Sequence, residues 1–306
     1  MSDQNLATLF PFKRHFLERN SQQYHYVNEG TGEPVVMVHG NPSWSFYYRN
    51  LVKTLSVSHQ CIVPDHIGCG LSDKPDDEDY SYTLASRIDD LEALLDHLAI
   101  DKNITLVVHD WGGMIGMGYA ARYPDRIKKL VILNTAAFHL PKNKSFPLPL
   151  AIGRNTMLGT ILVRGFNAFS SMASFIGVKR NPMTKEIRRA YVAPFNSWKN
   201  RISTLRFIQD IPLKPHDKNY QLVSDIEKCL PQFTKLPMII CWGLKDFVFD
   251  KHFLAVWQEK FPQAQVHAFE DCGHYILEDA SEEVVPLVTN FVNDHQAKTI
   301  TGSAND

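Results

Sequence analysis

The sequence lacks several patterns that would define a protein class. Its five cysteines form no CxxC pair and no zinc-binding spacing, and they are scattered as Cys61, Cys69, Cys229, Cys241 and Cys272. An odd, scattered set is typical of reduced thiols, so we expect a reducing compartment and a cytoplasmic protein. No run approaches the ~20 uninterrupted apolar residues that span a bilayer. The first 16 residues have no continuous apolar segment of the signal-peptide kind. We therefore expect neither a transmembrane segment nor a secretion signal.

An excess of charge of either sign is also missing. The chain has 32 Lys and Arg against 33 Asp and Glu, a formal net charge of -1. This balance, without a basic stripe, argues against a nucleic-acid partner. The glycine-bearing loop at residues 65–72 has neither a GxGxxG spacing nor a GK[ST] ending, which argues against nucleotide binding. With 306 residues, 44% of them hydrophobic, the chain can bury a large core.

The segment of residues 106–113, LVVHDWGG, has the pattern of a nucleophile elbow. An apolar strand pattern ends in His-Asp-Trp, and two glycines follow before a helical pattern begins. Such a turn lifts one side chain above a sheet, and here that residue is Asp110. The glycine usual two positions earlier is replaced by Val108, so the spacing rule is only half met. An ionised Asp can attack carbon directly and form a covalent adduct. The alternative is that Asp110 only caps the helix that follows.

Short buried strands alternate with helices along most of the chain. Strand patterns lie at residues 35–38, 61–64, 104–108, 130–133, 238–242 and 265–269, and residues 24–27 suggest an antiparallel edge strand. Helical patterns lie at residues 44–55, 84–98, 114–123 and 284–291. This alternation predicts an α/β fold with a mostly parallel central sheet flanked by helices.

The alternation stops between residues 145 and 211, where two helical and aromatic-rich stretches, 145–178 and 183–211, follow each other. We interpret them as a helical cap inserted between two strands. The predicted organisation is a core at residues 1–138, a cap at 139–217, the rest of the core at 218–295 and a flexible tail at 296–306. The apolar cap residues serve either ordinary helix packing or the roof of an apolar substrate tunnel.

Two further residues complete a catalytic pattern with Asp110. Asp246 follows the strand at 238–242, although Asp250 is close enough to compete for the same role. His274 follows the last strand, after a glycine. The order nucleophile, acid, histidine, each at the end of a strand, is that of the α/β-hydrolase triad.

Four motifs resemble the haloalkane dehalogenase branch of the α/β hydrolases: HGNP (residues 39–42), HDWGG (109–113), WGLKD (242–246) and CGHYILED (272–279). The resemblance implies an α/β-hydrolase fold, with Asp110 as nucleophile, His274 as base and Asp246 as its orienting acid. It also implies that Asn41 and Trp111 bind the leaving halide and that their backbone N–H groups form the oxyanion hole. One dehalogenase subgroup carries the acid after the preceding strand, where this chain has Asn134.

Loop and cap segments point to one group within that branch. Residues 41–49, 162–167, 190–195 and 206–212 look like the β-lactone decarboxylases of bacterial long-chain olefin biosynthesis. This resemblance implies a small hydrophobic substrate, a cis-3,4-dialkyl β-lactone, that is split into a cis-alkene and CO2. It implies neither a cofactor nor a metal, and it implies association with other olefin-pathway enzymes or self-association. Our mechanistic hypothesis is that Asp110 attacks the lactone carbonyl to give a mixed anhydride and that His274 handles the proton transfers.

Three alternatives stay open at this level. A haloalkane dehalogenase would use the same five residues. An epoxide hydrolase would need a cap tyrosine such as Tyr191 as acid, and Asn41 stands where those enzymes usually carry an aromatic residue. A non-catalytic binding or assembly protein would be expected to have lost a triad member, whereas this chain retains all three.

Overall fold

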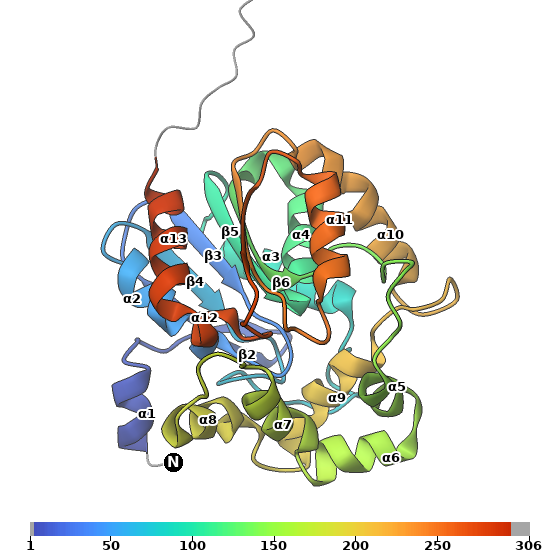
Figure 1. The fold of residues 1–306 in the computed structure, drawn as a ribbon. Coiled ribbons are helices and arrows are strands. Elements are labelled where there is room, and N and C mark those ends of the chain that lie inside the picture. Colours follow the sequence, from blue (N-terminus) through green and yellow to red (C-terminus); the bar gives the residue numbers. More distant parts are fainter. Residues whose placement is uncertain (1–2, 295–306) are drawn as a thin grey trace, which may run out of the picture.

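The computed structural model describes residues 3–294, and its centre is an eight-stranded sheet (Figure 1). The strand order is β1-β2-β4-β3-β5-β6-β7-β8, and β2 runs antiparallel to both of its neighbours while all other pairs are parallel. The strands are β1 (His15–Arg19), β2 (Gln22–Glu29), β3 (Pro34–Val38), β4 (Gln60–Pro64), β5 (Ile104–Asp110), β6 (Ile127–Thr135), β7 (Met238–Gly243) and β8 (Gln265–Phe269). The predicted mostly parallel α/β sheet is therefore confirmed.

Helices cover both faces of the sheet because its parallel strands are apolar on both sides. One face packs against α3 (Leu84–His97), α4 (Trp111–Arg122), α10 (Tyr220–Cys229) and α11 (Lys251–Lys260). The other face packs against η1 (Ser45–Tyr48), α2 (Arg49–Leu55), α12 (Ile276–Asp279) and α13 (Ser281–Asn293). Figure 1 shows these two groups on opposite sides of the strands. The remaining short elements of this part are α1 (Asp3–Leu9), η2 (Pro124–Arg126) and η6 (Leu230–Phe233).

A separate layer of helices lies between β6 and α10 in the sequence and across one end of the sheet in space (Figure 1). Its elements are α5 (Leu148–Asn155), α6 (Met157–Thr160), the π-helical turn η3 (Ile161–Gly165), α7 (Ala168–Ile176), α8 (Lys185–Val192), η4 (Ala193–Phe195), η5 (Lys199–Arg201) and α9 (Ile202–Gln209). We propose residues 139–217 as one cap and use that name for them below. The layer lies at the carboxyl ends of the parallel strands, where open α/β sheets bind their ligands.

Several element boundaries differ from those expected. β2 is not an edge strand, because β1 pairs outside it. The helix expected at 44–55 begins as the 3-10 turn η1, and the helix expected at 114–123 begins three residues earlier, at Trp111. The stretch at 183–211 divides into α8 and α9, which Pro194 and the turn that follows it separate. The tail at 296–306 lies outside the described residues.

Among residues 3–294, no helix combines the length and apolar character that crossing a bilayer requires.

Candidate active site

Asp110 lies at a sharp turn between β5 and α4. Its φ of 52° and ψ of -126° are a strained conformation for a residue with a side chain. The two glycines after Trp111 make the turn possible: a Cβ at Gly112 would lie 1.9 Å from the Val38 carbonyl oxygen, and one at Gly113 would lie 2.0 Å from Thr135 Oγ1. The Asp110 carboxylate makes no side-chain capping hydrogen bond to α4. The alternative that Asp110 only caps this helix is therefore wrong.

Val108 occupies the position where this kind of turn usually has glycine, and the room for it comes from the helix behind it. A Cβ at Gly116 of α4 would lie 2.7 Å from Val108 Cγ1. The valine side chain is accommodated because the opposing helix has no side chain at that point. The departure from the usual spacing thus has a packing explanation that the linear pattern does not show.

His274 lies between two carboxylates. Its Nδ1 is 2.7 Å from Asp246 Oδ2, and its Nε2 is 3.7 Å from Asp110 Oδ2. Asp246 is held in turn by Val248, whose backbone N–H donates to Oδ1 at 2.8 Å, and by the Asn134 side-chain amide, which donates to Oδ2 at 3.1 Å. Because Asp246 accepts from His274 Nδ1, the ring presents Nε2 to Asp110.

Burial and charge shift the pKa values of the two groups that face each other. Burial raises the pKa of Asp110 above its ordinary value, although His274 and the backbone N–H groups of Asn41 and Trp111 act in the opposite direction. Burial alone would lower the pKa of His274, but the neighbouring carboxylates Asp246 and Asp110 outweigh it, so the pKa of His274 is raised. The site therefore favours a protonated imidazole between the two carboxylates.

The turn at residues 39–42 brings a hydrogen-bond donor to the nucleophile. The backbone N–H of Asn41 donates to Asp110 Oδ1 at 2.5 Å. Gly40 allows this approach, because a Cβ there would lie 2.0 Å from the same oxygen. His39 fixes the turn: its Nε2 accepts from the backbone N–H of His66 at 3.2 Å and its Nδ1 donates to the Gly40 carbonyl at 2.8 Å.

The structure brings all five site residues of the sequence analysis together. Asp110, His274, Asn41 and Trp111 line one cavity, and Asp246 lies directly behind His274. The competitor Asp250 has another role, since it caps α11 through the backbone N–H of His252 at 2.9 Å and pairs with Lys144.

Two polar side chains that support the site were not assigned this role from the sequence. Asn134 bonds to both the carbonyl and the N–H of Gly243 and also to Asp246, so it fixes the strand end that carries the acid. Asp279 accepts backbone hydrogen bonds from Gly273 and from Lys179, Arg180 and Asn181 of the cap. Asp279 thus ties the cap to the loop that carries His274. The only sequence signal for these roles was position: Asn134 ends a strand, and Asp279 closes the CGHYILED motif.

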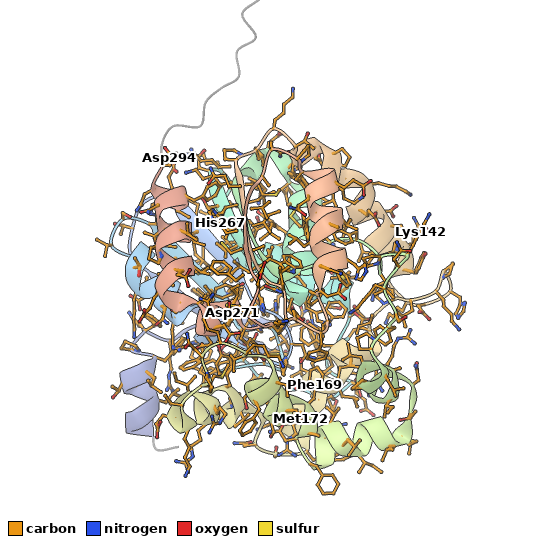
Figure 2. All side chains as sticks on the ribbon, viewed as in Figure 1. Lys142, Phe169, Met172, His267, Asp271 and Asp294 are labelled. Carbon is orange, nitrogen blue, oxygen red and sulfur yellow. The ribbon has the colours of Figure 1, made fainter. Side chains whose placement is uncertain are left out.

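A cavity of about 360 Å³ lies between Asp110 and the cap. Apart from Asp110, Asn41, His139 and His274, its lining side chains are apolar or small, and none is Lys, Arg or Glu. The cap part of the lining consists of His139, Leu140, Phe146, Pro147, Leu148, Pro149, Leu150, Ile152, Gly153, Gly159, Leu162, Val163, Ala168, Phe169, Met172, Ala173, Ile176, Gly177, Ile208, Ile211, Pro212 and Leu213. Phe169 and Met172 mark this region in Figure 2. Such a site accepts an apolar molecule with one polar reacting group next to Asp110.

Tyr191, the candidate acid of an epoxide hydrolase, does not reach the cavity. Its hydroxyl donates to Glu278 Oε1 at 2.6 Å, and its ring stacks on Tyr275. No tyrosine lines the cavity within residues 3–294. The geometry therefore gives no support to the epoxide hydrolase alternative. In the same part of the chain, no group of three or more His, Cys, Asp and Glu residues is arranged to hold a metal ion.

The fold and this site define the class of the protein. The sequence of residues 33–281 matches the family described as the α/β hydrolase fold, and the chain belongs to that family.

Two relatives and one solved structure show which members of the family the chain is similar to. The chain is 74% identical over 289 residues to the cis-3-alkyl-4-alkyloxetan-2-one decarboxylase of Shewanella oneidensis, a match that covers 94% of this chain and 91% of the relative. It is 55% identical over 274 residues to the protein of the same name from Xanthomonas campestris, covering 87% of this chain and 91% of the relative. Among solved structures, a mutant haloalkane dehalogenase from Agrobacterium tumefaciens superposes with a TM-score of 0.82 at 24% identity, over 92% of this chain and 97% of that one. At that identity the structural likeness shows the fold alone.

Proposed function

We propose that the protein is a β-lactone decarboxylase, which converts a cis-3,4-dialkyl β-lactone into a cis-alkene and CO2. The observation that carries the proposal is an ionisable carboxylate at the floor of an apolar cavity, in a chain 74% identical to a relative named for an oxetan-2-one, the β-lactone ring. The cavity offers apolar contacts to two alkyl groups and one charged group to the ring.

In the first step, Asp110 attacks the carbonyl carbon of the lactone with Oδ2, the oxygen that faces His274. The bond between this carbon and the ring oxygen breaks, and its electron pair remains on the ring oxygen as an alkoxide. The product is a mixed anhydride of Asp110. His274 in its protonated form donates a hydrogen bond from Nε2 to the alkoxide, which agrees with its raised pKa.

In the second step, the alkoxide attacks the carboxyl carbon of Asp110, and the anhydride bond breaks to free the carboxylate of the substrate. Negative charge then develops on Oδ1, which the backbone N–H of Asn41 already contacts. The backbone N–H of Trp111 acts on the same carboxylate. In this proposal the two donors serve as the oxyanion hole, which is the role that the resemblance to the dehalogenases implies for them.

In the last step, the substrate carboxylate leaves as CO2. The electrons of the broken carbon–carbon bond form the alkene, and the bond between the alkyl carbon and the ring oxygen breaks. Asp110 is thereby restored as a carboxylate, and the balance requires neither water nor an external proton. Because the ring oxygen stays on Asp110, a lactone with a heavy isotope of oxygen in its ring should label Asp110 in a single turnover. An unlabelled Asp110 after product release would exclude this route.

The function is tested by incubating the purified protein with a cis-dialkyl β-lactone and with 1-bromohexane and measuring alkene and bromide in parallel. We expect alkene and CO2 in equal amounts, formed far faster than bromide. Hydrolysis of the lactone to a hydroxy acid, without alkene, would refute the proposal.

A haloalkane dehalogenase is the second candidate, because Asn41 and Trp111 lie on the cavity beside Asp110, where that chemistry needs donors for a halide. Its final step requires neutral His274 to activate water, whereas the decarboxylation requires the protonated form. The two functions therefore predict opposite pH dependences. Bromide release that exceeds alkene formation, and that increases with pH, would favour the dehalogenase.

A further inference from the structure

The exposed apolar side chains of the protein are concentrated on the cap. Thirteen large hydrophobic residues are exposed within residues 3–294, and ten of them lie between Leu148 and Trp198. They come from neighbouring elements, since α5 packs on α6, η3 contacts α6 and α7, and η5 contacts η3. Phe166 is 74% exposed, Phe175 62% and Met157 81%. A cluster of this kind marks a surface that another apolar body covers.

Part of the same cluster lines the cavity, so the cavity reaches the surface among these residues. Leu148, Leu162, Met172 and Ile176 are exposed and also line the cavity, as does Phe247 from the loop after β7. Figure 2 shows Met172 on the cap, at the end of the molecule opposite Asp294. An apolar molecule that leaves a body docked on this surface would therefore enter the cavity without crossing water.

The charge of the cap indicates what kind of apolar body covers this surface. Residues 139–217 contain 13 Lys and Arg against 3 Asp and Glu, a formal charge of +10, so the rest of the chain carries -11 although the whole is nearly neutral. Exposed basic residues, such as Arg189 and Lys199, form no salt bridge with a described residue. Two further arginines lie over aromatic rings of the apolar cluster: Arg164 is 4.7 Å from the Trp198 ring centre and Arg188 is 4.6 Å from that of Phe175.

We infer that the cap docks on an anionic lipid bilayer, with the cavity entrance facing the membrane. Exposed apolar groups that enter the headgroup region, and exposed cations that form no salt bridge, are the two contributions that bind a protein to such a surface. The acidic remainder of the chain is repelled by the same surface, which fixes the orientation. The docking follows from the surface alone. Only the idea that the bilayer supplies a two-tailed lactone rests on the proposed function.

The test is co-sedimentation of the purified full chain with phosphatidylcholine vesicles, with and without phosphatidylglycerol, in the absence of substrate. We expect binding to the anionic vesicles that weakens at high salt and little binding to the neutral ones. Because no turnover is involved, the outcome does not depend on whether the decarboxylation is correct.

Two pairs of variants separate the contributions. Phe166→Ser with Phe175→Ser removes apolar contacts outside the cavity lining, and Arg189→Glu with Lys199→Glu reverses the charge; each pair should weaken vesicle binding by about tenfold or more. Matched controls lie at the opposite edge of the sheet: Val57→Ser, at a residue 87% exposed, and Lys102→Glu should leave binding unchanged.

Three outcomes would overturn the inference. Binding to neither vesicle would do so, as would equal binding by the cap variants and their controls. If the chain is a dimer that Phe166→Ser with Phe175→Ser converts to a monomer, and no vesicles are bound, the surface is a self-association interface instead. Circular dichroism and thermal unfolding of each variant show whether the fold is intact.

Discussion

The carboxyl edge of the sheet and the cap meet at one cavity but are built in different ways. At the sheet edge, the carboxylates of Asp110 and Asp246 both accept backbone hydrogen bonds, and Asp246 is also fixed by Asn134. In the cap, the cavity lining is a set of apolar side chains on short helices, and many of their neighbours are exposed. The difference indicates that the reaction is determined by rigid backbone positions at the sheet, whereas the choice of substrate is determined by cap side chains that can change without altering the reaction.

The largest expected effect lies at the sheet edge, in Asp110→Asn. The variant keeps the shape of the side chain but loses the charged nucleophile, so we expect activity to fall by roughly 10⁴-fold or more. The free energy of unfolding of the variant, in contrast, should stay the same or increase. Burial raises the pKa of Asp110, so the folded protein loses stability as the pH rises from the ordinary pKa of an aspartate to the raised one, and the asparagine variant avoids this cost.

Thermal unfolding at neutral pH checks that second effect. The Asp110→Asn protein should unfold at the same temperature as the wild type or at a higher one. A clearly lower unfolding temperature would mean that the Asp110 carboxylate stabilises the fold. Asp110 would then not be a residue that the sheet edge holds for the reaction at a cost in stability, and this difference from the cap would be contradicted.

The next effect concerns Asp246→Asn, which changes the pH dependence as well as the rate. Asp246 raises the pKa of His274, so its removal should lower that pKa and shift the loss of protonated His274 to lower pH. For the proposed decarboxylation, which needs protonated His274, the high-pH limb of the rate profile should therefore move to lower pH. The rate at neutral pH should fall by about 10³-fold, since the ring also loses its orienting acceptor.

A pH–rate profile of both proteins on the β-lactone measures this shift, with Asp250→Asn as the matched control. Asp250 caps α11 and does not contact His274, so its variant should keep the wild-type profile. A high-pH limb that stays in place in Asp246→Asn would show that a group other than His274 controls it.

The division between the two regions also explains what the sequence could predict. Strands β3 to β7 contain short apolar runs. Asp110 ends β5, and Asp246 and His274 follow β7 and β8 after short loops, so local patterns predict both the sheet and these three residues. The supporting contacts of Asn134 and Asp279 join residues about 100 positions apart, and no local pattern encodes them. The room for Val108 likewise depends on Gly116 of the next helix.

The cap was less predictable for a related reason. Its helices are short, and their ends depend on packing and on breaks such as the one at Pro194, so periodicity predicted helical content but not the separate elements. The edge strand β1 was missed because only its pairing with β2 reveals it. The balanced net charge of the whole chain also concealed the opposite charges of the cap and the core.

A smaller effect is expected in the cap, from Ala168→Phe. Ala168 lines the cavity on α7, and a phenyl group there would occupy space needed by an alkyl chain. We expect kcat/KM to fall by about 10- to 100-fold for long-chain lactones and to change little for short-chain ones. Ser171→Phe on the same helix, outside the lining, is the matched control. If long and short substrates lose activity equally in Ala168→Phe, the cap side chains do not set chain-length preference.

The smallest effect on the rate is expected where the two regions are joined, at Asp279. Its carboxylate is fully buried and accepts backbone N–H groups from Gly273, next to His274, and from residues 179–181 of the cap. In Asp279→Asn an amide N–H₂ would face those donors, so we expect a loss of about 3 kcal/mol in unfolding free energy and only a several-fold decrease in kcat. Asp225→Asn, at an exposed surface pair with Lys228, should change neither quantity. Denaturant unfolding measures the loss of stability, and kinetics on short and long lactones measure the effect on the reaction. A decrease in kcat that is the same for both substrates indicates that the loop carrying His274 has loosened. A decrease confined to the long substrate would show that Asp279 acts on the cap alone and that the sheet edge keeps its geometry without it.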